Sequence, residues 1–587
     1  MKGLRRTKIV ATIGPSSESP EVLAALVAAG MDVARLNFSH GGRADLARRL
    51  ERVNAQRRAD PTHPLGLLLD TRGPEIRIGS FPEGRVILRP GDAFRLYPDG
   101  RSGAAGGVGV FYARLPADVR PGQVILLDDG NLALRVHTVT PAEVVCEVEV
   151  GGELLSGKKV NLPGVDLTLP TLQPEDVADL AVGAEAGADF VAVSFVRSAE
   201  DVHNARRAAD ATGRRMSIIS KIETQQGVAH AEEILRASDG LMVARGDLGV
   251  ELPAEEVPIV QKDLIRRCIE AGKPVITATQ MLESMVLRPR PTRAEASDVA
   301  NAIFDGSDAV MLSAETAIGH FPVESVSTMA RIAVRAEQAL PYREQLSRRG
   351  NALTGSVTDA IGYATAVAAQ NLGASAIITV TGSGHTARIM AKYRPGTPIL
   401  AMTSAEDVIR QLTVVWGIQP LRIVRGPVVE ETIAAAIDRA VEHGSVQAGD
   451  LVVVTAGMPS GMPGMTNMLR VHTVGDIVVR GTGIGNRSAS GRVVRVRHAA
   501  EASERFHAGD VLVAPSAPQE LVPFLERATA VVTEEDGLSS NAAVIGLALG
   551  IPVIVGAVGA MDALRDGEEV TIDSSRGLCF RGRTRPS

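Results

Sequence analysis

The segment Ser217–Glu223 (Ser-Ile-Ile-Ser-Lys-Ile-Glu) is a short apolar, β-branched run that ends in charged side chains. This composition favours a buried β-strand that presents charge at its carboxyl end. Lys221 and Glu223 are two residues apart, so on a strand they point to the same face. A second run of this kind, Leu241–Asp247 (LMVARGD), also ends in a carboxylate. The two runs predict one cation and two carboxylates at neighbouring strand ends, which suits a metal site beside a fixed positive charge.

Lysine is scarce in this chain, since only eight of the 62 basic residues are lysine. A lysine inside an apolar strand therefore suggests a specific task for its ammonium group. The structural alternative is a lysine whose stem packs on apolar surface while Glu223 neutralises its charge. The residues of this segment leave both interpretations open.

Similar polar-ended runs recur through the first 320 residues and alternate with helical patterns rich in Ala, Leu and Arg. This alternation favours parallel strands, and eight such units is the number in a (β/α)8 barrel, whose chemistry lies at the carboxyl ends of the strands. The eight runs are Lys8–Gly14, Val33–Ser39, Leu65–Thr71, Phe190–Phe195, Ser217–Glu223, Leu241–Asp247, Pro274–Gln280 and Ala309–Glu315.

Changes in composition divide the rest of the chain. Gly/Pro turns and short alternating runs predict a small all-β domain over residues 74–166, inserted between two parts of the barrel domain, 1–73 and 167–340. A domain inserted at the active-site end can act as a lid. Residues 341–475 predict a separate α/β domain, and residues 476–587 a fourth compact domain. We therefore expect an α/β protein built around a TIM barrel.

Composition excludes several classes of protein. The chain is 45% hydrophobic and 22% charged, which is ordinary for a globular protein. A net charge of −6, with arginine spread along the sequence, argues against a nucleic-acid binder. Three scattered cysteines indicate no disulfide framework and fit a reducing compartment, and no apolar run reaches the length of a signal or membrane-spanning segment. We expect a cytoplasmic enzyme that binds neither nucleic acid nor membrane.

The turn Thr381-Gly382-Ser383-Gly384-His385-Thr386 follows a predicted strand over 376–381 and precedes a predicted helix. Backbone amides and hydroxyls at a helix N-terminus can bind an anion. Helix capping by Ser or Thr accounts for the same residues. Taken alone, the turn does not decide between the two.

Seven long motifs are spread along the chain. They are TKIVATIGPSS (7–17), GMDVARLNFSHG (30–41), LDTRGPEIR (69–77), GKKVNLPG (157–164), IISKIETQQG (218–227), VARGDLGVELP (243–253) and the segment 276–319, which begins ITATQMLESM. These motifs resemble those of the pyruvate kinase family and follow the family's order across residues 7–475. Residues 476–587 resemble the phosphoenolpyruvate-utilising mobile domain, a swivelling-type α/β domain. The resemblance implies a TIM barrel with a small β-barrel lid, and transfer of the phosphoryl group of phosphoenolpyruvate to ADP, giving ATP and pyruvate in the last step of glycolysis.

The resemblance implies catalytic roles for Lys221, Thr279 and Arg35. Lys221 would contact the transferring phosphoryl group and Arg35 the phosphate, because phosphoryl transfer depends on positioning and charge neutralisation. Thr279 would lie on the face where enolpyruvate is protonated, and a water relay suits it better than direct donation. Glu223 and Asp247 would bind Mg²⁺ (or Mn²⁺). The substrate-binding set is Arg35, Lys221, Gly246, Asp247 and Thr279, where Gly246 permits a close approach of the backbone.

The same resemblance implies a monovalent cation, usually K⁺, and a nucleotide site. In the family, Glu at the position of Glu75 accompanies K⁺ dependence, so we expect K⁺ dependence here. The motif leaves open which of Lys158 and Lys159 faces the nucleotide, because the family usually has Gly before Val160. The implied K⁺ ligands are Asn37, Ser39, Asp70 and Thr71, and the nucleotide candidates are Arg77, His40, Lys158 and Asn161.

Regulation and assembly also follow from the resemblance. It makes the 381–386 turn an effector phosphate site, with AMP or a sugar phosphate as the effector and Thr381, Ser383, Gly384 and Thr386 as its residues. It implies a homotetramer. In phosphotransferases with the mobile domain a His carries the phosphoryl group, but here Asn541 stands in its place. Asn has no nucleophilic nitrogen, so we expect this domain to be structural or regulatory.

Two other functions fit parts of the pattern. A metal-dependent barrel aldolase or lyase would use the same acids, and a Schiff-base aldolase would use the lysine, although Glu223 would hold Lys221 protonated and disfavour an imine. Neither explains the inserted β domain. A catalytically inactive metabolite-binding regulator would be expected to have lost an active-site charge, yet Arg35, Lys221, Glu223 and Asp247 are all present.

Overall fold

The computed structural model describes residues 5–39, 42–165, 167, 169–350, 356–457 and 466–583. The chain divides into two compact units, Met1–Gly362 with Thr381–Arg422, and Tyr363–Val380 with Ile423–Ser587. Within the described ranges, no helix combines the length and apolarity needed to cross a membrane.

Among the described residues of the first unit, eight strands close into a barrel in the order β1-β17-β16-β15-β14-β13-β3-β2, and neighbours pair in parallel. Each predicted run overlaps one of these strands, so the predicted (β/α)8 barrel is confirmed. The strands are β1 (Lys8–Thr12), β2 (Val33–Asn37), β3 (Gly66–Asp70), β13 (Phe190–Val193), β14 (Ser217–Ile222), β15 (Gly240–Ala244), β16 (Val275–Ala278) and β17 (Ala309–Leu312).

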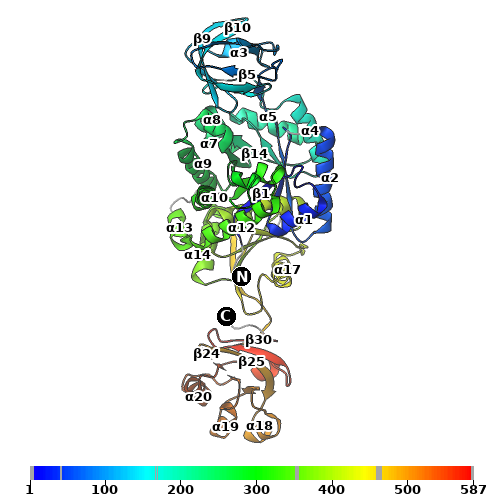
Figure 1. Ribbon diagram of the computed structural model, residues 1–587. Helices are drawn as coiled ribbons and strands as arrows, with labels where there is room; N and C mark the ends of the chain where they lie inside the picture. The colour runs from blue at the N-terminus through cyan, green and yellow to red at the C-terminus, as the bar shows by residue number, and fades with distance from the viewer. Residues whose placement is uncertain are drawn as a thin grey trace. The chain divides into compact units, whose positions relative to one another are not determined.

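Helices follow the strands and surround the barrel (Figure 1). In α12 the residues Val326, Met329 and Ala333 recur at helical spacing and are buried against the strands. A capping box of Thr292 and Glu295 fixes the start of α10. The helices are α1 (Pro20–Ala29), α2 (Arg43–Ala59), α4 (Pro174–Glu185), α5 (Ala199–Asp210), α6 (Gln225–Ala229), α7 (Ala231–Ala237), α8 (Arg245–Glu251), α9 (Val257–Ala271), η1 (Glu283–Val286), α10 (Arg293–Asp305), α11 (Ala314–Ala317) and α12 (Pro322–Gln338).

The chain between β3 and β13 forms the expected all-β insertion. It contains a sheet ordered β4-β12-β8-β9-β10-β6-β7 and a β11-β5 pair, around a core that includes Phe94, Leu134 and Val144. Alternating apolar residues on β9 and β10 point into that core. The elements are β4 (Ile76–Arg77), β5 (Arg85–Leu88), β6 (Ala93–Tyr97), β7 (Gly107–Gly109), α3 (Leu115–Asp118), β8 (Val124–Leu127), β9 (Leu132–Thr140), β10 (Glu143–Val150), β11 (Gly152–Leu155) and β12 (Lys159–Asn161).

The first unit also contains the parallel pair β19 (Ile399–Thr403) and β20 (Ile418–Arg422). β19 is a continuous apolar run apart from its last residue, whereas Pro420 interrupts the strand pattern of β20. The accompanying helices are α13 (Tyr342–Arg349), α15 (His385–Lys392), α16 (Glu406–Gln411) and η3 (Leu412–Val414), and α14 (Val357–Asn371) spans the boundary between the units.

The second unit contains two groups of strands. In the first, β18 (Ala376–Val380) pairs in parallel with β21 (Leu451–Ala456), which pairs with β22 (Met468–Thr473). The second is a sheet ordered β23-β30-β29-β25-β26-β27-β28-β24. The remaining elements are α17 (Val429–Glu442), β23 (Ile477–Arg480), β24 (Thr482–Ile484), β25 (Ser488–Arg495), α18 (Ala499–Arg505), β26 (Val511–Ala514), η4 (Gln519–Leu521), α19 (Val522–Leu525), β27 (Ala530–Thr533), α20 (Asn541–Leu549), β28 (Val553–Val555), α21 (Ala560–Ala563), β29 (Glu569–Asp573) and β30 (Leu578–Arg581).

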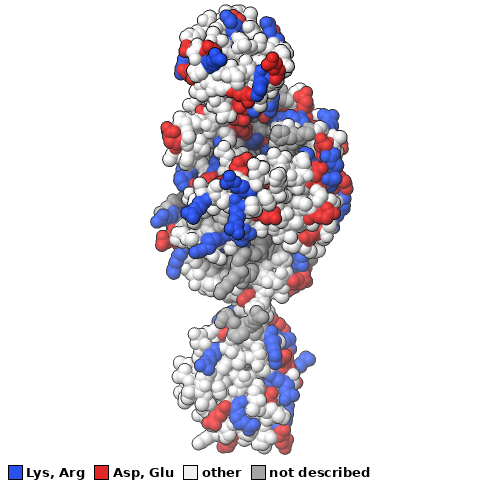
Figure 2. Space-filling model, viewed as in Figure 1, with Lys and Arg blue, Asp and Glu red and all other residues white. Residues whose placement is uncertain are grey.

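Charged side chains of both signs appear on each part of the face shown in Figure 2. A group of basic side chains gathers on the first unit in this view. On this face, therefore, the lysine and arginine side chains are not spread evenly.

Candidate active site

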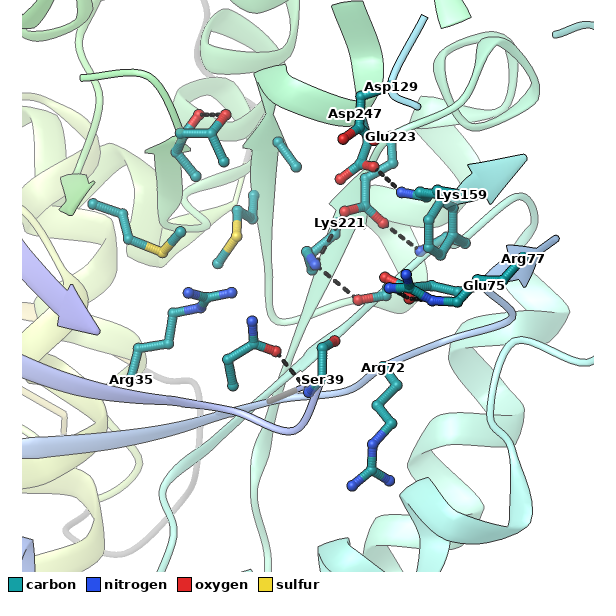
Figure 3. A pocket seen from close by; sticks show the side chains of 18 of the residues that line it. Arg35, Ser39, Arg72, Glu75, Arg77, Asp129, Lys159, Lys221, Glu223 and Asp247 are labelled. Carbon is teal, nitrogen blue, oxygen red and sulfur yellow. Dashed lines mark hydrogen bonds and ion pairs between the residues drawn. The ribbon is translucent and has the colours of Figure 1, made fainter. Parts of the chain in front are cut away.

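A cavity of about 300 Å³ opens at the carboxyl ends of the barrel strands and brings most of the predicted residues together (Figure 3). Residues of the barrel and of the β insertion both contribute to its wall. The lining residues are Arg35, Asn37, Ser39, Arg72, Glu75, Arg77, Asp128, Asp129, Lys158, Lys159, Ser194, Phe195, Lys221, Glu223, Met242, Ala244, Asp247, Ala278, Thr279 and Met311.

Lys221, on β14, is held by three oxygens. Its Nζ lies 3.1 Å from Asp70 Oδ1, 2.7 Å from Ser194 Oγ and 3.0 Å from Glu223 Oε1. Burial would lower the pKa of Lys221, but the Asp70 and Glu223 carboxylates outweigh it and raise that pKa. Lys221 is therefore a permanent cation in the cavity wall, which argues against the Schiff-base aldolase because imine formation needs a neutral amine.

Glu223 follows the end of β14 and is 1% exposed. The Phe195 N–H donates to its Oε2 at 2.6 Å, while its buried Oε1 accepts no hydrogen bond and faces the Lys221 ammonium. Burial raises the pKa of Glu223, and the nearby charge of Asp247 adds to the rise although Lys221 opposes it. The carboxylate thus has an oxygen available for a further cation.

Asp247 was predicted to close a strand, and this is wrong in detail. Strand β15 ends at Ala244, and Asp247 lies in the first turn of α8, because the polar Arg-Gly-Asp that follows the apolar run begins the helix. A carboxylate in the first turn of a helix is favourable there. The side chain still faces the cavity beside Glu223 (Figure 3).

Two lysines of the insertion reach the cavity and point to different partners. Lys159 Nζ forms a close ion pair with Asp247 Oδ1 and lies 4.9 Å from the centre of the Phe195 ring. Lys158 Nζ lies 2.6 Å from Asp128 Oδ1. Burial would lower the pKa of Lys159, but the Asp247 carboxylate outweighs this effect and raises the pKa of Lys159. In the same way, burial would raise the pKa of Asp247, but the Lys159 ammonium outweighs this effect and lowers the pKa of Asp247.

Arg35 and Asp70 form a buried pair beneath the cavity. Arg35 Nε donates to Asp70 Oδ2 at 2.7 Å, and its NH1 donates to Thr12 Oγ1 at 2.8 Å. Burial would raise the pKa of Asp70, but Arg35 and Lys221 outweigh it and lower that pKa. Asp70 therefore holds both Arg35 and Lys221, two of the cations that line the cavity.

The four residues predicted as K⁺ ligands lie at the ends of β2 and β3. Asn37 and Ser39 line the cavity, and Asn37 Oδ1 accepts a hydrogen bond from the Ser39 N–H at 3.0 Å. Asp70 and Thr71 are buried behind the lining, and Thr71 Oγ1 accepts from the Ser194 N–H at 3.1 Å. One carboxylate with several neutral oxygens is a donor set that suits a monovalent cation.

The nucleotide candidates separate in the structure. Arg77 lines the cavity, where its NH2 lies 2.6 Å from Glu75 Oε2 and its NH1 donates to the Gly157 carbonyl at 3.0 Å. Asn161 is 6% exposed on β12, outside the cavity lining, and its Oδ1 accepts no hydrogen bond. His40 lies outside the described residues.

Thr279 follows β16 in a left-handed backbone conformation, with φ of +69°. Its Oγ1 accepts a hydrogen bond from the Gly246 N–H at 2.8 Å and donates to the Ala278 carbonyl at 2.6 Å. A Cβ at Gly246 would lie 3.5 Å from Thr279 Oγ1, an ordinary contact, so the protein alone does not require glycine there. Arg245 supports this turn, since its NH2 lies 2.7 Å from Asp298 Oδ2 and 2.7 Å from the Thr279 carbonyl.

Glu223 and Asp247 fit a divalent cation that keeps several water ligands. No group of three or more His, Cys, Asp or Glu side chains in the described part of the chain is arranged to hold a metal ion. Mg²⁺ often takes only one or two protein carboxylates and completes its octahedron with water and substrate oxygens. The unbonded Oε1 of Glu223 is the clearest sign of such a site.

The predicted effector turn leads into α15. Gly384, with φ of +78°, precedes the helix, and its N–H donates to Thr381 Oγ1 at 3.0 Å. Arg388 NH2 donates to the Ser383 carbonyl at 3.1 Å, and Thr386 is 8% exposed. The N-cap residue of α15 is Gly384 itself, and Thr381 Oγ1 accepts its N–H, so a threonine hydroxyl does take part in the turn that starts the helix.

Sequence reasoning missed Ser194, Phe195 and Thr12 as members of the site. Ser194 Oγ accepts from Lys221, and it donates to the Thr71 carbonyl at 2.7 Å. The signal was present, because Ser194 is the polar residue near the end of the predicted run 190–195. Thr12 gave no such signal, since its role depends on the through-space approach of Arg35.

Comparisons with known proteins agree with this geometry. Family models match as "Pyruvate kinase, barrel domain" over residues 4–326, "Pyruvate kinase, alpha/beta domain" over 359–472 and "PEP-utilising enzyme, mobile domain" over 506–577. The chain is 49% identical over 582 residues to a pyruvate kinase of Geobacillus stearothermophilus, covering 98% of this chain and 99% of the relative. It is 47% identical over 582 residues to one from Sporosarcina psychrophila, with 99% of both chains covered.

A solved structure gives the same result. The chain aligns with a pyruvate kinase from Cryptosporidium parvum at a TM-score of 0.76 and 37% identity, covering 80% of this chain and 96% of that one. The barrel-domain model covers the part of the chain in which the charged cavity lies, and the curated relatives match over nearly their whole length. The chain belongs to the pyruvate kinase family.

Proposed function

We propose that this chain transfers the phosphoryl group of phosphoenolpyruvate to ADP, giving ATP and pyruvate, with Mg²⁺ (or Mn²⁺) and K⁺. The observation that carries the proposal is the Lys221 ammonium, which lies 3.0 Å from Glu223 Oε1, an oxygen that accepts no hydrogen bond, in the wall of one cavity. Phosphoryl transfer needs this combination of fixed charges, because its transition state spreads negative charge over the phosphoryl oxygens.

Lys221 and Arg35 act on the phosphoryl group. Both line the cavity and both are anchored by Asp70, so their charges need no reorganisation when the transition state forms. Lysine suits the position of Lys221 because a compact ammonium can approach the moving group, whereas a planar guanidinium is longer. Ser194 keeps the ammonium directed by accepting one of its hydrogens.

Glu223 and Asp247 would hold the divalent ion, and Asn37, Ser39, Asp70 and Thr71 would hold K⁺. When bound, the two cations supply positive charge that neutralises the substrate oxygens. Glu75 lines the cavity and pairs with Arg77, which keeps a carboxylate near the nucleotide side of the site.

Thr279 and Gly246 shape the side of the cavity where enolpyruvate would be protonated. The Gly246 N–H fixes Thr279 Oγ1, which lines the cavity. A hydroxyl is too weak an acid to donate its proton unaided, so Thr279 would orient a water that delivers the proton to carbon. The insertion contributes Arg77, Lys158 and Lys159 to the wall of the cavity, so it would keep bulk water away from the ATP and the enol that form there.

The remaining assignments concern regulation and assembly. Arg77, His40, Lys158 and Asn161 are the proposed nucleotide residues, and the 381–386 turn is the proposed site for AMP or a sugar phosphate in a homotetramer. We assign residues 1–73 and 167–340 to the barrel domain, 74–166 to the lid, 341–475 to the regulatory domain and 476–587 to the extra domain. In the extra domain Asn541 Nδ2 donates to the Ala517 carbonyl at 2.8 Å, a structural bond that supports a non-catalytic role.

A coupled assay for pyruvate tests the proposal. The full-length protein should turn over phosphoenolpyruvate and ADP in the presence of Mg²⁺ and K⁺, and Lys221→Met should lose at least about a thousandfold in kcat. Lack of turnover by the folded wild-type protein would contradict the proposed function. Aldol cleavage without phosphoryl transfer would favour the aldolase alternative.

A further inference from the structure

Lys159 lines the cavity, and the proposed reaction gives its ammonium no contact with a substrate or an ion. It begins β12, which pairs with β4 and β8 inside the insertion, so its backbone belongs to that domain. Its side chain is 13% exposed and crosses to Asp247 on α8 of the barrel. The ammonium therefore takes the position of a cation at one of the two carboxylates that suit a divalent ion (Figure 3).

The neighbouring charges make this position specific. Asp70 already has Arg35 and Lys221, both from barrel strands, and Glu223 has Lys221. Asp247 is paired instead with a lysine of the insertion. Lys158, the adjacent lysine, pairs with Asp128 within the insertion and leaves Asp247 to Lys159.

A divalent ion and the Lys159 ammonium compete for the same place. Two cations within a few ångströms repel strongly even at a high effective dielectric constant. The ammonium occupies Asp247 Oδ1 at hydrogen-bond distance, so an ion bound through that oxygen has to displace it. The Phe195 ring, whose centre lies 4.9 Å from Nζ, adds a cation–π contact that favours this position of the ammonium.

We propose that Lys159 is an internal cation that ties the insertion to Asp247 in the metal-free enzyme and weakens binding of the divalent ion. Lys159 thereby sets the concentration of Mg²⁺ at which the site fills, and it links filling of the site to release of the insertion from α8. This inference rests on the proposed function, which assigns the ion to Glu223 and Asp247.

The experiment measures Mn²⁺ binding to the full-length protein without phosphoenolpyruvate or nucleotide, using electron paramagnetic resonance of the free ion. Lys159→Met keeps most of the aliphatic stem and removes the charge, and it should tighten Mn²⁺ binding about tenfold or more. Lys159→Arg keeps a cation and should bind Mn²⁺ far more weakly than Lys159→Met does. Lys262→Met is the matched control, because Lys262 pairs with Asp305 on the surface and is 58% exposed, so its loss should leave Mn²⁺ affinity unchanged.

Equal or weaker Mn²⁺ binding by folded Lys159→Met would overturn the proposal, as would equal tightening by Lys262→Met. Asp247→Asn in the Lys159→Met background separates this failure from a failure of the proposed metal site. If Asp247→Asn removes binding but Lys159→Met does not tighten it, only the competition is wrong. If Asp247→Asn leaves binding unchanged, the metal assignment is wrong and the competition falls with it.

Discussion

Ser194→Ala is the substitution that most directly tests how Lys221 is positioned. The ammonium donates hydrogen bonds to Asp70 Oδ1 at 3.1 Å and Ser194 Oγ at 2.7 Å, and it forms an ion pair with Glu223 Oε1 at 3.0 Å. Removing the serine hydroxyl leaves both ion pairs but frees one hydrogen. A hydrogen bond to a charged group contributes about 1.5–3 kcal/mol. If that amount is lost in the transition state, kcat/KM for phosphoenolpyruvate falls about 10- to 150-fold.

The assay is steady-state kinetics in the coupled pyruvate assay, with Ser220→Ala as the control. Ser220 is also a buried serine and is next to Lys221 in the sequence. Its Oγ is hydrogen-bonded to Ser238 Oγ at 2.6 Å, and Ser220 does not line the cavity. Ser220→Ala should leave kcat/KM within about twofold of the wild-type value, because the Ser220 hydroxyl does not contact the Lys221 ammonium.

A double-mutant cycle sharpens the test. If Ser194 acts through Lys221, adding Ser194→Ala to Lys221→Met should cost little more than Lys221→Met alone. Unchanged kinetics in Ser194→Ala, or full additivity in the double variant, would refute the reasoning.

Three further outcomes are expected. Replacing K⁺ by tetramethylammonium should abolish most turnover, and Glu75→Lys should lessen that dependence; equal activity in both buffers would contradict the K⁺ assignment. Burial raises the pKa of Glu251 from 4.5 to about 7. As the pH rises, Glu251 therefore ionises first in the unfolded chain, and the free energy of unfolding falls between those two pH values. Glu251→Gln should therefore be about 1–3 kcal/mol more stable than the wild type at pH 8 and gain less at pH 5.5, seen as a melting-temperature difference that grows with pH; a constant difference would argue against this cause. Deleting residues 476–587 should leave turnover measurable while changing thermal stability or effector response, and loss of all chemistry in a folded truncation would show that the extra domain is catalytic.

Most of the barrel, and the position of Lys221 at a strand end, could be predicted from the sequence for physical reasons. Buried parallel strands read as apolar runs, and their carboxyl ends must carry whatever polar residues the site uses. The two-residue spacing of Lys221 and Glu223 was enough to predict that both side chains point the same way, although β14 ends at Ile222 and Glu223 lies just beyond it. Asp247 was assigned to the right site but to the wrong element, because a run of residues does not show where a strand gives way to a helix.

The interactions that finish the site were not predictable. Lys159 and Asp247 are 88 residues apart, and their pairing depends on how the insertion meets the barrel. Arg35 and Asp70 are 35 residues apart on adjacent strands, and their register becomes visible only when the barrel closes. The local pattern fixes which face a side chain occupies, whereas its partner is fixed by tertiary packing.

The backbone of Thr279 has a consequence for laboratory evolution of this protein. A β-branched residue at φ of +69° is strained by about 1–3 kcal/mol, which glycine would relieve. Glycine would also remove the hydroxyl that receives the Gly246 N–H and faces the cavity. Selection for heat tolerance alone should therefore favour glycine at position 279. Selection for turnover should instead keep the threonine, so the two selections favour different residues at the same position.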